Sequence, residues 1–259
     1  MNLNLDPFLK DKTLIFTVTS DGYKYFTWNL YQFFQTVKPS VPLCILCLDK
    51  ESHDFFNRIA FLPSRLVLME GPKYDHKSPA LFGTTPFKRM NRMKLRLLEE
   101  LSQRPEIERL VFLDSDIALF KDPMSYLLER FQEAPLWFQC DEKKENDFTC
   151  SNPDGCTNAC TGVIAMHLTD ETRPMFQRLY SISESWKDAI TDQDYINNRL
   201  HTLQIPYKTL SRDKFPNGIF LKDNRFREGD PILCHFNHVV GMEKKRFMKN
   251  KDCWLLQVV

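Results

Sequence analysis

Two aspartates separated by one serine, Asp114 and Asp116, follow the apolar run Leu110 to Leu113. The run is aliphatic, β-branched and aromatic, which predicts a short strand buried on both faces. Residues two apart in extended chain point the same way, so the two carboxylates should converge while Ser115 points elsewhere. Like charges this close repel each other unless a cation joins them. The motif therefore predicts a divalent metal site, and Mg²⁺ or Mn²⁺ suits carboxylate oxygens best.

An Asp-x-Asp pair by itself is common, because one aspartate can cap a helix while the other is solvated. A possible partner lies in the tail CHFNHVVGMEKKRFM, where His235 and His238 precede Gly241 and Lys244. A neutral imidazole can ligate a metal, glycine lets a ligand approach the backbone, and lysine can neutralise a departing diphosphate. Together with the distant aspartates, these residues predict a metal that binds a phosphorylated substrate.

Other candidate residues lie near the ends of predicted strands, where open parallel sheets bind their ligands. The turn after the first strand offers hydroxyl and stacking groups for a base and ribose, although an ordinary turn is an equal alternative. Lys94 is a candidate for facing the diphosphate, and Gly162, placed before a predicted strand, is a candidate for close approach by the sugar. Asp192 and Gln193 begin a predicted helix with Thr191 as its N-cap. The turn candidates are Thr19, Ser20, Asp21 and Tyr23.

Apolar runs alternate with helical patterns from the start of the chain, which predicts an α/β fold with a mostly parallel sheet flanked by helices. The expected strands are Thr13–Ser20, Leu43–Leu48, Arg65–Met69, Leu110–Leu113, Leu136–Cys140 and Val163–Met166. The expected helices lie near Tyr23–Lys38, Glu51–Ala60, Met90–Leu101, Arg173–Ser183 and Asp192–Leu200, with an irregular tail from Phe215. We expect a single domain over residues 1–259, with a nucleotide-binding half at about 13–118 and a sugar and acceptor half at about 119–259.

The charge balance argues against a polyanionic partner, because 35 Lys and Arg residues face 34 Asp and Glu residues. No nucleic-acid partner is therefore expected. No stretch approaches the ~20 apolar residues of a membrane span, and the first residues lack the order of a signal peptide. The sequence predicts a soluble, cytoplasmic protein, although an anchor removed from the chain would leave no trace in it.

The eight cysteines fall into different settings. Cys44 and Cys47 form a C-x-x-C inside an apolar run, where packing in a buried strand is expected rather than redox chemistry. Four others crowd into one polar stretch whose spacing matches no common zinc pattern. Free thiols are the favoured interpretation, with disulfides or a zinc site as alternatives. These four are Cys140, Cys150, Cys156 and Cys160.

Five stretches make the chain resemble the nucleotide-diphospho-sugar transferases, metal-dependent glycosyltransferases with the GT-A fold. In chain order they are FLDSDIALFKDP, CTGVIAMHLTDETRPMFQRLY, TDQDYIN, FPNG and HFNHVVGMEKK. The resemblance extends from about Thr13 to about Trp254, and its specificity lies in the combination. It implies a Rossmann-like sheet, Mn²⁺ or Mg²⁺ on the Asp-x-Asp motif, and transfer of a hexose or pentose from a nucleotide-diphosphate donor, with UDP favoured, to a glycan or glycoconjugate acceptor.

The resemblance also implies roles for single residues. It assigns Asp114 and Asp116, with Ser115 between them, to metal and donor binding, and it assigns Asp192 and Gln193 to the sugar pocket. For the metal-binding histidine, one family pattern selects His235 and a related pattern selects His238; both remain candidates here. Two other functions stay open: a sugar-phosphate nucleotidyltransferase, and a non-enzymatic module stapled by zinc through the clustered cysteines.

Overall fold

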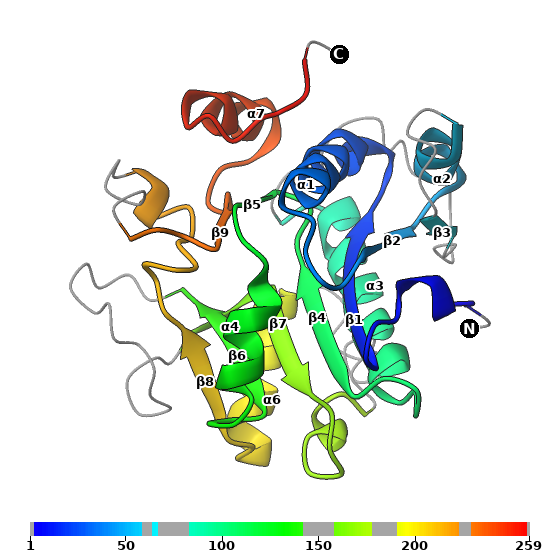
Figure 1. Cartoon of the computed structure of the whole chain (residues 1–259), viewed down its shortest axis with the longest axis vertical. Helices are drawn as coiled ribbons and strands as arrows, with labels where there is room; N and C mark the ends of the chain where they lie inside the picture. The colour runs from blue at the N-terminus through cyan, green and yellow to red at the C-terminus, as the bar shows by residue number, and fades with distance from the viewer. Residues whose placement is uncertain are drawn as a thin grey trace.

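A computed structural model of the chain describes residues 3–58, 64–66, 83–141, 158–177, 191–222 and 229–257. Seven strands form one sheet in the order β3-β2-β1-β4-β7-β6-β8, and two further strands, β5 and β9, pair beside it (Figure 1). The strands are β1 Thr13–Thr19, β2 Leu43–Cys47, β3 Ser64–Leu66, β4 Arg109–Leu113, β5 Ile117–Leu119, β6 Leu136–Cys140, β7 Ala159–His167, β8 Tyr207–Leu210 and β9 Leu233–His235.

Six α-helices are described around these strands. They are α1 Lys24–Val37, α2 Lys50–Arg58, α3 Thr85–Ser102, α4 Pro123–Arg130, α6 Asp192–Leu203 and α7 Gly241–Asn250. Short 3-10 turns occupy Asp6–Phe8, Asp21–Tyr23, Arg173–Met175 and Phe220–Lys222. Four of the strand pairings in the large sheet are parallel, while β7 runs antiparallel to both β4 and β6. The sheet is therefore mostly parallel, as the sequence predicts.

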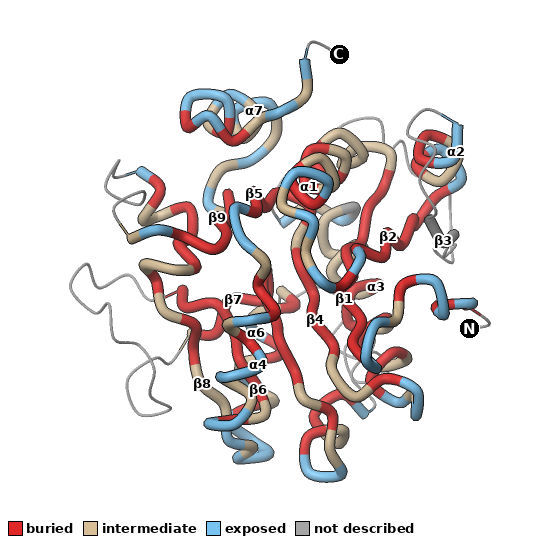
Figure 2. The backbone as a smooth tube through the Cα atoms, viewed as in Figure 1, coloured by how far each residue is buried: buried red, intermediate tan, exposed pale blue. Residues whose placement is uncertain are grey.

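The large sheet separates two hydrophobic cores, because successive side chains of a strand point to opposite faces. In β1, Ile15 packs in the core formed with α1, α2 and α4, whereas Leu14 and Phe16 pack in the core formed with α3 and α6. The central strands are buried along their length (Figure 2). Near-continuous burial is typical of a sheet covered on both faces, and it explains why these strands appear in the sequence as unbroken apolar runs.

The predicted elements of the first half agree with the structure, while the second half contains elements that the sequence pattern does not indicate. The tail from Phe215 was expected to be irregular, and this is wrong, since β9 and α7 lie within it. Strands of three residues, such as β5 and β9, are too short to show a period. Helix α7 buries only Met248 and is otherwise rich in charge, so it shows no apolar stripe. The ends of three expected elements, at Ala60, Met69 and Ser183, lie outside the described residues. The described start of the expected helix Arg173–Ser183 is a 3-10 turn at Arg173–Met175.

Strand β7 begins four residues before the expected strand at Val163. Thr161 and Gly162 are therefore inside a strand and not in a turn before it, which corrects the prediction. Glycine is depleted in strands, yet Gly162 provides space for a neighbouring ring, and the side chain of Thr161 is hydrogen-bonded within the site. Site requirements thus override strand propensity at Gly162.

Candidate functional site

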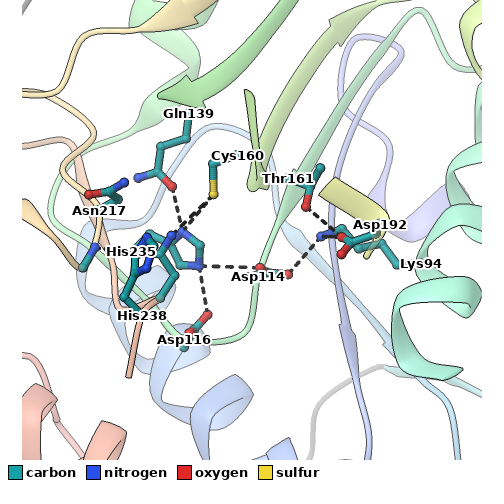
Figure 3. A network of polar contacts seen from close by, with 12 residues as sticks. Lys94, Asp114, Asp116, Gln139, Cys160, Thr161, Asp192, Asn217, His235 and His238 are labelled. Atoms are coloured by element: carbon teal, nitrogen blue, oxygen red, sulfur yellow. Dashed lines mark hydrogen bonds and ion pairs between the residues drawn. The ribbon is translucent and has the colours of Figure 1, made fainter. Parts of the chain in front are cut away.

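Three potential metal ligands converge where β4 ends. Asp114, Asp116 and His235 each present one ligand atom, and the three atoms lie within 4.8 Å of one another. The Nε2 atom of His235 is 3.5 Å from Asp114 Oδ2 and 3.4 Å from Asp116 Oδ1 (Figure 3). Asp116 and His235 are buried, while about a third of the Asp114 side chain is exposed. This is the one such group among the described residues.

Backbone pairing brings the histidine to the aspartates. Strands β5 and β9 are antiparallel and place Ile117 opposite His235, and the amide of Phe236 donates to the carbonyl of Asp116 at 3.1 Å. At the other side of the motif, the amide of Asp114 donates to the carbonyl of Gly162 at 2.8 Å. The positions of the three potential ligands are therefore set by main-chain hydrogen bonds and not by flexible side chains alone.

Gly162 makes room for the imidazole of His235. A Cβ atom built on Gly162 would lie 2.0 Å from Cε1 of that ring, a distance that no side chain can tolerate. Glycine is thus required at this position by the close approach of a side chain of the same protein, and the approach of a sugar to Gly162 stays a prediction. Gly162 still lines the cavity described below.

The carboxylates are held in their ionised form. Burial opposes ionisation of Asp116, yet Lys244 and His235 together keep the pKa of Asp116 far below its ordinary value. Burial likewise opposes ionisation of Asp114, and Lys94 with His235 lowers the pKa of that residue. The same carboxylates raise the pKa of His235 despite its burial. Two carboxylates and one imidazole form an oxygen and nitrogen donor set that fits Mn²⁺ well and Mg²⁺ adequately.

Lys94 connects the aspartate motif to the start of α6. Its ammonium lies 2.8 Å from Asp192 Oδ2 and 3.5 Å from Asp114 Oδ1, and it stands 4.5 Å from the ring centroid of Phe112. The hydroxyl of Thr161 donates to the same Asp192 oxygen at 2.7 Å. Burial lowers the pKa of Lys94, but the two carboxylates outweigh it and the net shift is upward. Lys94 is 5% exposed, so it is not a solvated residue at a helix start.

Thr191, and not Asp192, caps helix α6. The hydroxyl of Thr191 accepts from the amide of Asp194, and the Asp194 carboxylate accepts from the amide of Thr191, which completes a capping box. The N-cap expected from the sequence is thus confirmed. Because capping is done by other residues, the buried carboxylate of Asp192 is available for Lys94 and for the cavity.

A second polar group, missed by the sequence analysis, surrounds Asp141 at the end of β6. Asp141 Oδ1 lies 2.9 Å from His238 Nε2 and accepts from Asn217 Nδ2 at 2.7 Å. Asp141 Oδ2 accepts from Gln193 Nε2 at 3.0 Å. His238 therefore lies with Asp141 and not with the three converging ligands. Asn217 belongs to the quoted FPNG stretch, and this was the available signal for it; nothing in the sequence pattern identified Asp141.

These groups line one cavity of about 570 Å³, a size typical of small-molecule sites. Its polar wall carries the three potential metal ligands, Lys94, Lys244, Asp192 and Gln193. Its apolar wall includes Val18, Phe87 and Met90, and Tyr23 lines it as well. The cavity therefore offers both charged groups for a diphosphate and flat apolar contacts for a ring.

Some predicted donor-binding residues are placed away from the described lining of the cavity. Thr19 is fully buried and accepts from Thr27 Oγ1 at 2.8 Å, and the Ser20 hydroxyl contacts Met90 Sδ at 3.7 Å. Asp21 forms an ion pair with Lys24. Ser115, by contrast, lines the cavity between the two aspartates.

The remaining predicted residues lie at the start of α7 and in the strands. Gly241 adopts φ of 59° and begins α7, a backbone conformation that favours glycine, with open space around its Cα. Lys244 follows on that helix and contacts Asp116.

Cys44 and Cys47 are buried on opposite faces of β2, as packing residues should be. Cys140 is buried, Cys160 is a buried free thiol, and Cys150 and Cys156 lie outside the described residues. In the part of the chain that the structure describes, no helix is both long and apolar enough to cross a membrane.

Solved structures with a similar fold are glycosyltransferases. The galactosyltransferase LgtC, crystallised with donor and acceptor sugar analogues, superposes with a TM-score of 0.57 at 13% identity, covering 94% of this chain and 97% of that one. The glycosyltransferase GlyE of Streptococcus pneumoniae TIGR4 gives 0.56 at 12% identity, covering 94% and 60%. Mouse xyloside xylosyltransferase 1 gives 0.52 at 11% identity, covering 86% and 97%. The architecture is that of a GT-A glycosyltransferase.

The family follows from the sequence match itself. The family model for nucleotide-diphospho-sugar transferases matches residues 41–248, and the chain belongs to this family. It is accordingly a glycosyltransferase of the nucleotide-sugar class, which decides against the two alternatives raised by the sequence. No curated protein sequence matches the chain significantly.

Proposed function

We propose that the protein transfers a sugar, a hexose or a pentose, from a UDP-sugar to a hydroxyl of a carbohydrate or glycoconjugate acceptor, with Mn²⁺ or Mg²⁺ as cofactor. The observation that carries the proposal is the convergence of Asp114, Asp116 and His235 on one wall of the cavity. When bound there, the cation would stabilise the negative charge of the departing nucleotide diphosphate.

The residues of the chain supply the remaining steps. Asp114 and Asp116 would hold the cation, and Lys244, which contacts Asp116, would neutralise part of the charge of the departing diphosphate. Asp192 and Gln193 hydrogen-bond hydroxyls of the donor sugar. Tyr23 lines the same cavity and supports the nucleoside by ring contact. Each of these groups is fixed by neighbours before substrate arrives, which reduces the entropy lost on binding.

His235 is the proposed metal-binding histidine. Its Nε2 faces both aspartates at 3.4–3.5 Å, whereas Nε2 of His238 is engaged with Asp141 at 2.9 Å. The preference for His235 thus rests on direction as well as on distance.

Alanine replacements should separate the two histidines. We expect His235→Ala to raise the Mn²⁺ concentration needed for half-maximal transfer by about 100-fold, since one of three protein ligands is lost. His238→Ala should change that concentration by less than about threefold, because Asp141 and not the cation loses its partner. Activity measured against Mn²⁺ concentration checks this. A larger Mn²⁺ requirement in the His238 variant than in the His235 variant would reverse the assignment.

A thermal-shift screen tests the function as a whole. A ligand that binds only the folded protein raises the melting temperature, so UDP-sugars with Mn²⁺ should stabilise the protein more than either component alone. The matched control is Asp116→Asn, in which the synergy between nucleotide and metal should disappear. Equal stabilisation by all nucleotide sugars with or without metal would contradict metal-dependent donor binding.

A further inference from the structure

We propose that Gln139 is a positioning residue that fixes the direction of the His235 imidazole, so that Nδ1 bonds Gln139 and Nε2 is the nitrogen that faces Asp114 and Asp116. The inference rests on the proposed function, because it explains how this chain prepares a nitrogen ligand for the proposed cation. Gln139 lies on β6, is fully buried and is separated from the aspartates by the histidine ring (Figure 3).

Main-chain carbonyls determine which way the amide of Gln139 points. Its Nε2 donates to the carbonyl of Phe215 at 2.9 Å and to the carbonyl of Pro216 at 3.2 Å. A carbonyl oxygen can only accept, so the opposite amide orientation would set oxygen against two oxygens. The nitrogen of Gln139 must therefore face these carbonyls, and its Oε1 must face the histidine.

The orientation of the amide in turn decides the position of the imidazole hydrogen. Gln139 Oε1 lies 2.7 Å from Nδ1 of His235. Because an amide oxygen only accepts, Nδ1 must carry the hydrogen of that bond. A cation can bind only a nitrogen that carries no hydrogen, so Nε2 is the ring atom left to serve as its ligand. That atom is the one that faces Asp114 and Asp116.

The other neighbours of the ring leave this role to Gln139. The thiol sulfur of Cys160 is 3.9 Å from Nδ1, much farther than the amide oxygen, and it already accepts from Nδ2 of Asn237 at 3.6 Å. The opposite wall is Gly162, which has no side chain to bond. The main-chain amide of His235 donates at 3.0 Å to the carbonyl of Pro216, the same carbonyl that accepts from Gln139. The backbone of His235 and the side-chain amide of Gln139 are therefore held by the same carbonyl group.

The strand ladder is interrupted at the residue that makes these contacts. Strands β6 and β7 pair Phe138 with Ile164, but Gln139 pairs with Cys160, so the register shifts between Phe138 and Gln139. Irregular ladder positions re-aim a side chain and are common beside active sites. Here the shift leaves Thr161, Gly162 and Val163 outside the pairing with β6, next to the space that the His235 ring occupies.

Metal binding in the presence of saturating UDP tests the inference without relying on activity. Imidazole nitrogen contributes to Mn²⁺ binding, whereas Ca²⁺ prefers oxygen ligands. We expect Gln139→Met, which keeps the side-chain length and removes the acceptor, to weaken Mn²⁺ binding by about 10- to 100-fold, the usual cost of losing such an outer partner. Ca²⁺ binding should change by less than about threefold. Free Mn²⁺ is measured by electron paramagnetic resonance and Ca²⁺ binding by calorimetry.

A double-mutant cycle shows whether Gln139 acts through His235. In a His235→Ala background, Gln139→Met should have almost no further effect on Mn²⁺ affinity, since the ring to be oriented is gone. The matched control for a buried amide is Asn29→Leu. Asn29 is also fully buried and bonds the main chain of Cys253 and Leu255, away from the cavity. Its replacement should lower stability without changing the ratio of Mn²⁺ to Ca²⁺ affinity.

The possible outcomes separate the two proposals. If His235→Ala weakens Mn²⁺ binding but Gln139→Met does not, the inference is overturned and the proposed metal site stands. Equal loss from Gln139→Met with and without His235 would also overturn it, since the effect would then be structural. If neither variant changes Mn²⁺ affinity, or the unmodified protein binds none, both proposals fail. Should Gln139→Met not fold, Gln139→Leu, which also lacks the acceptor, should weaken Mn²⁺ binding by the same 10- to 100-fold; Mn²⁺ affinity within about threefold of the unmodified protein there would overturn the inference.

Discussion

Asp116→Asn should lower metal-dependent transfer by about 1,000-fold, or about 4 kcal/mol of transition-state stabilisation, while the protein stays folded. The side chain keeps its shape, but the replacement removes a buried negative charge that lies beside Lys244 and His235. An amide oxygen is a weaker ligand for a hard cation than a carboxylate is. Steady-state rates over a range of Mn²⁺ concentrations, with the melting temperature of each variant, measure the effect.

The matched control for this replacement is Asp122→Asn. Asp122 also accepts main-chain hydrogen bonds, from Met124 and from Ser40 at 2.9 Å each, as the N-cap of α4 outside the cavity. Asparagine is a good N-cap but can accept only one of these two bonds, so the control should lose about 1 kcal/mol of stability and retain its turnover. Full transfer activity in a folded Asp116 variant, at low as well as high Mn²⁺, would contradict the proposed metal site.

Asp192→Ala should reduce kcat/KM by about 100-fold or more and leave UDP affinity within about threefold. The carboxylate is proposed to bond a hydroxyl of the donor sugar, and UDP carries no sugar beyond its ribose. A site that pairs with a hydroxyl discriminates strongly, because losing the pair leaves a buried polar group unsatisfied. Steady-state turnover, a UDP titration and the melting temperature of this variant give its kcat/KM, its UDP affinity and its stability.

Stability should also fall in this variant, for a reason visible in the structure. Lys94 is buried and loses its nearest carboxylate, keeping only the Asp114 oxygen at 3.5 Å, so a loss of about 3 kcal/mol is expected. The control is Asp194→Ala, two residues along the same helix. It breaks the capping box and should cost about 1 kcal/mol with little change in kcat/KM. Parallel loss of UDP and donor binding in the Asp192 variant would argue against contact with the sugar.

Much of the sheet could be predicted because its strands are buried on both faces. Strands such as β1, β2 and β6 are unbroken apolar runs, and the predicted bounds of β6 agree with the observed ones. The elements that were missed have little local signal. Strands β5 and β9 are three residues long, and their pairing depends on segments far apart in the chain, which no local pattern reports.

The site could be predicted where its residues form a motif of reactive side chains at a fixed spacing in the sequence. The Asp-x-Asp motif, His235, Lys94 and Asp192 meet in the structure as a group. Asp141 and Gln139 were not found, because a single aspartate after a strand, or a single glutamine within one, is unremarkable until its neighbours are known. Thr19 and Ser20 were predicted to bind the donor because of their place at the end of the first strand. Their side chains instead contact other residues of the protein, Thr27 and Met90.

The pairing of β5 with β9 also governs when the site can exist during folding. Asp116 and Lys244 are 128 positions apart, and His235 is brought to Asp116 by a ladder that closes a similarly long loop. Loop closure of this length is entropically costly, and contacts of high sequence separation form late and slowly. A chain emerging from the ribosome therefore carries its aspartates long before it carries the proposed metal site. If the site binds Mn²⁺ as proposed, metal affinity should appear only in the last kinetic phase of refolding, and Mn²⁺ binding would then report completed folding.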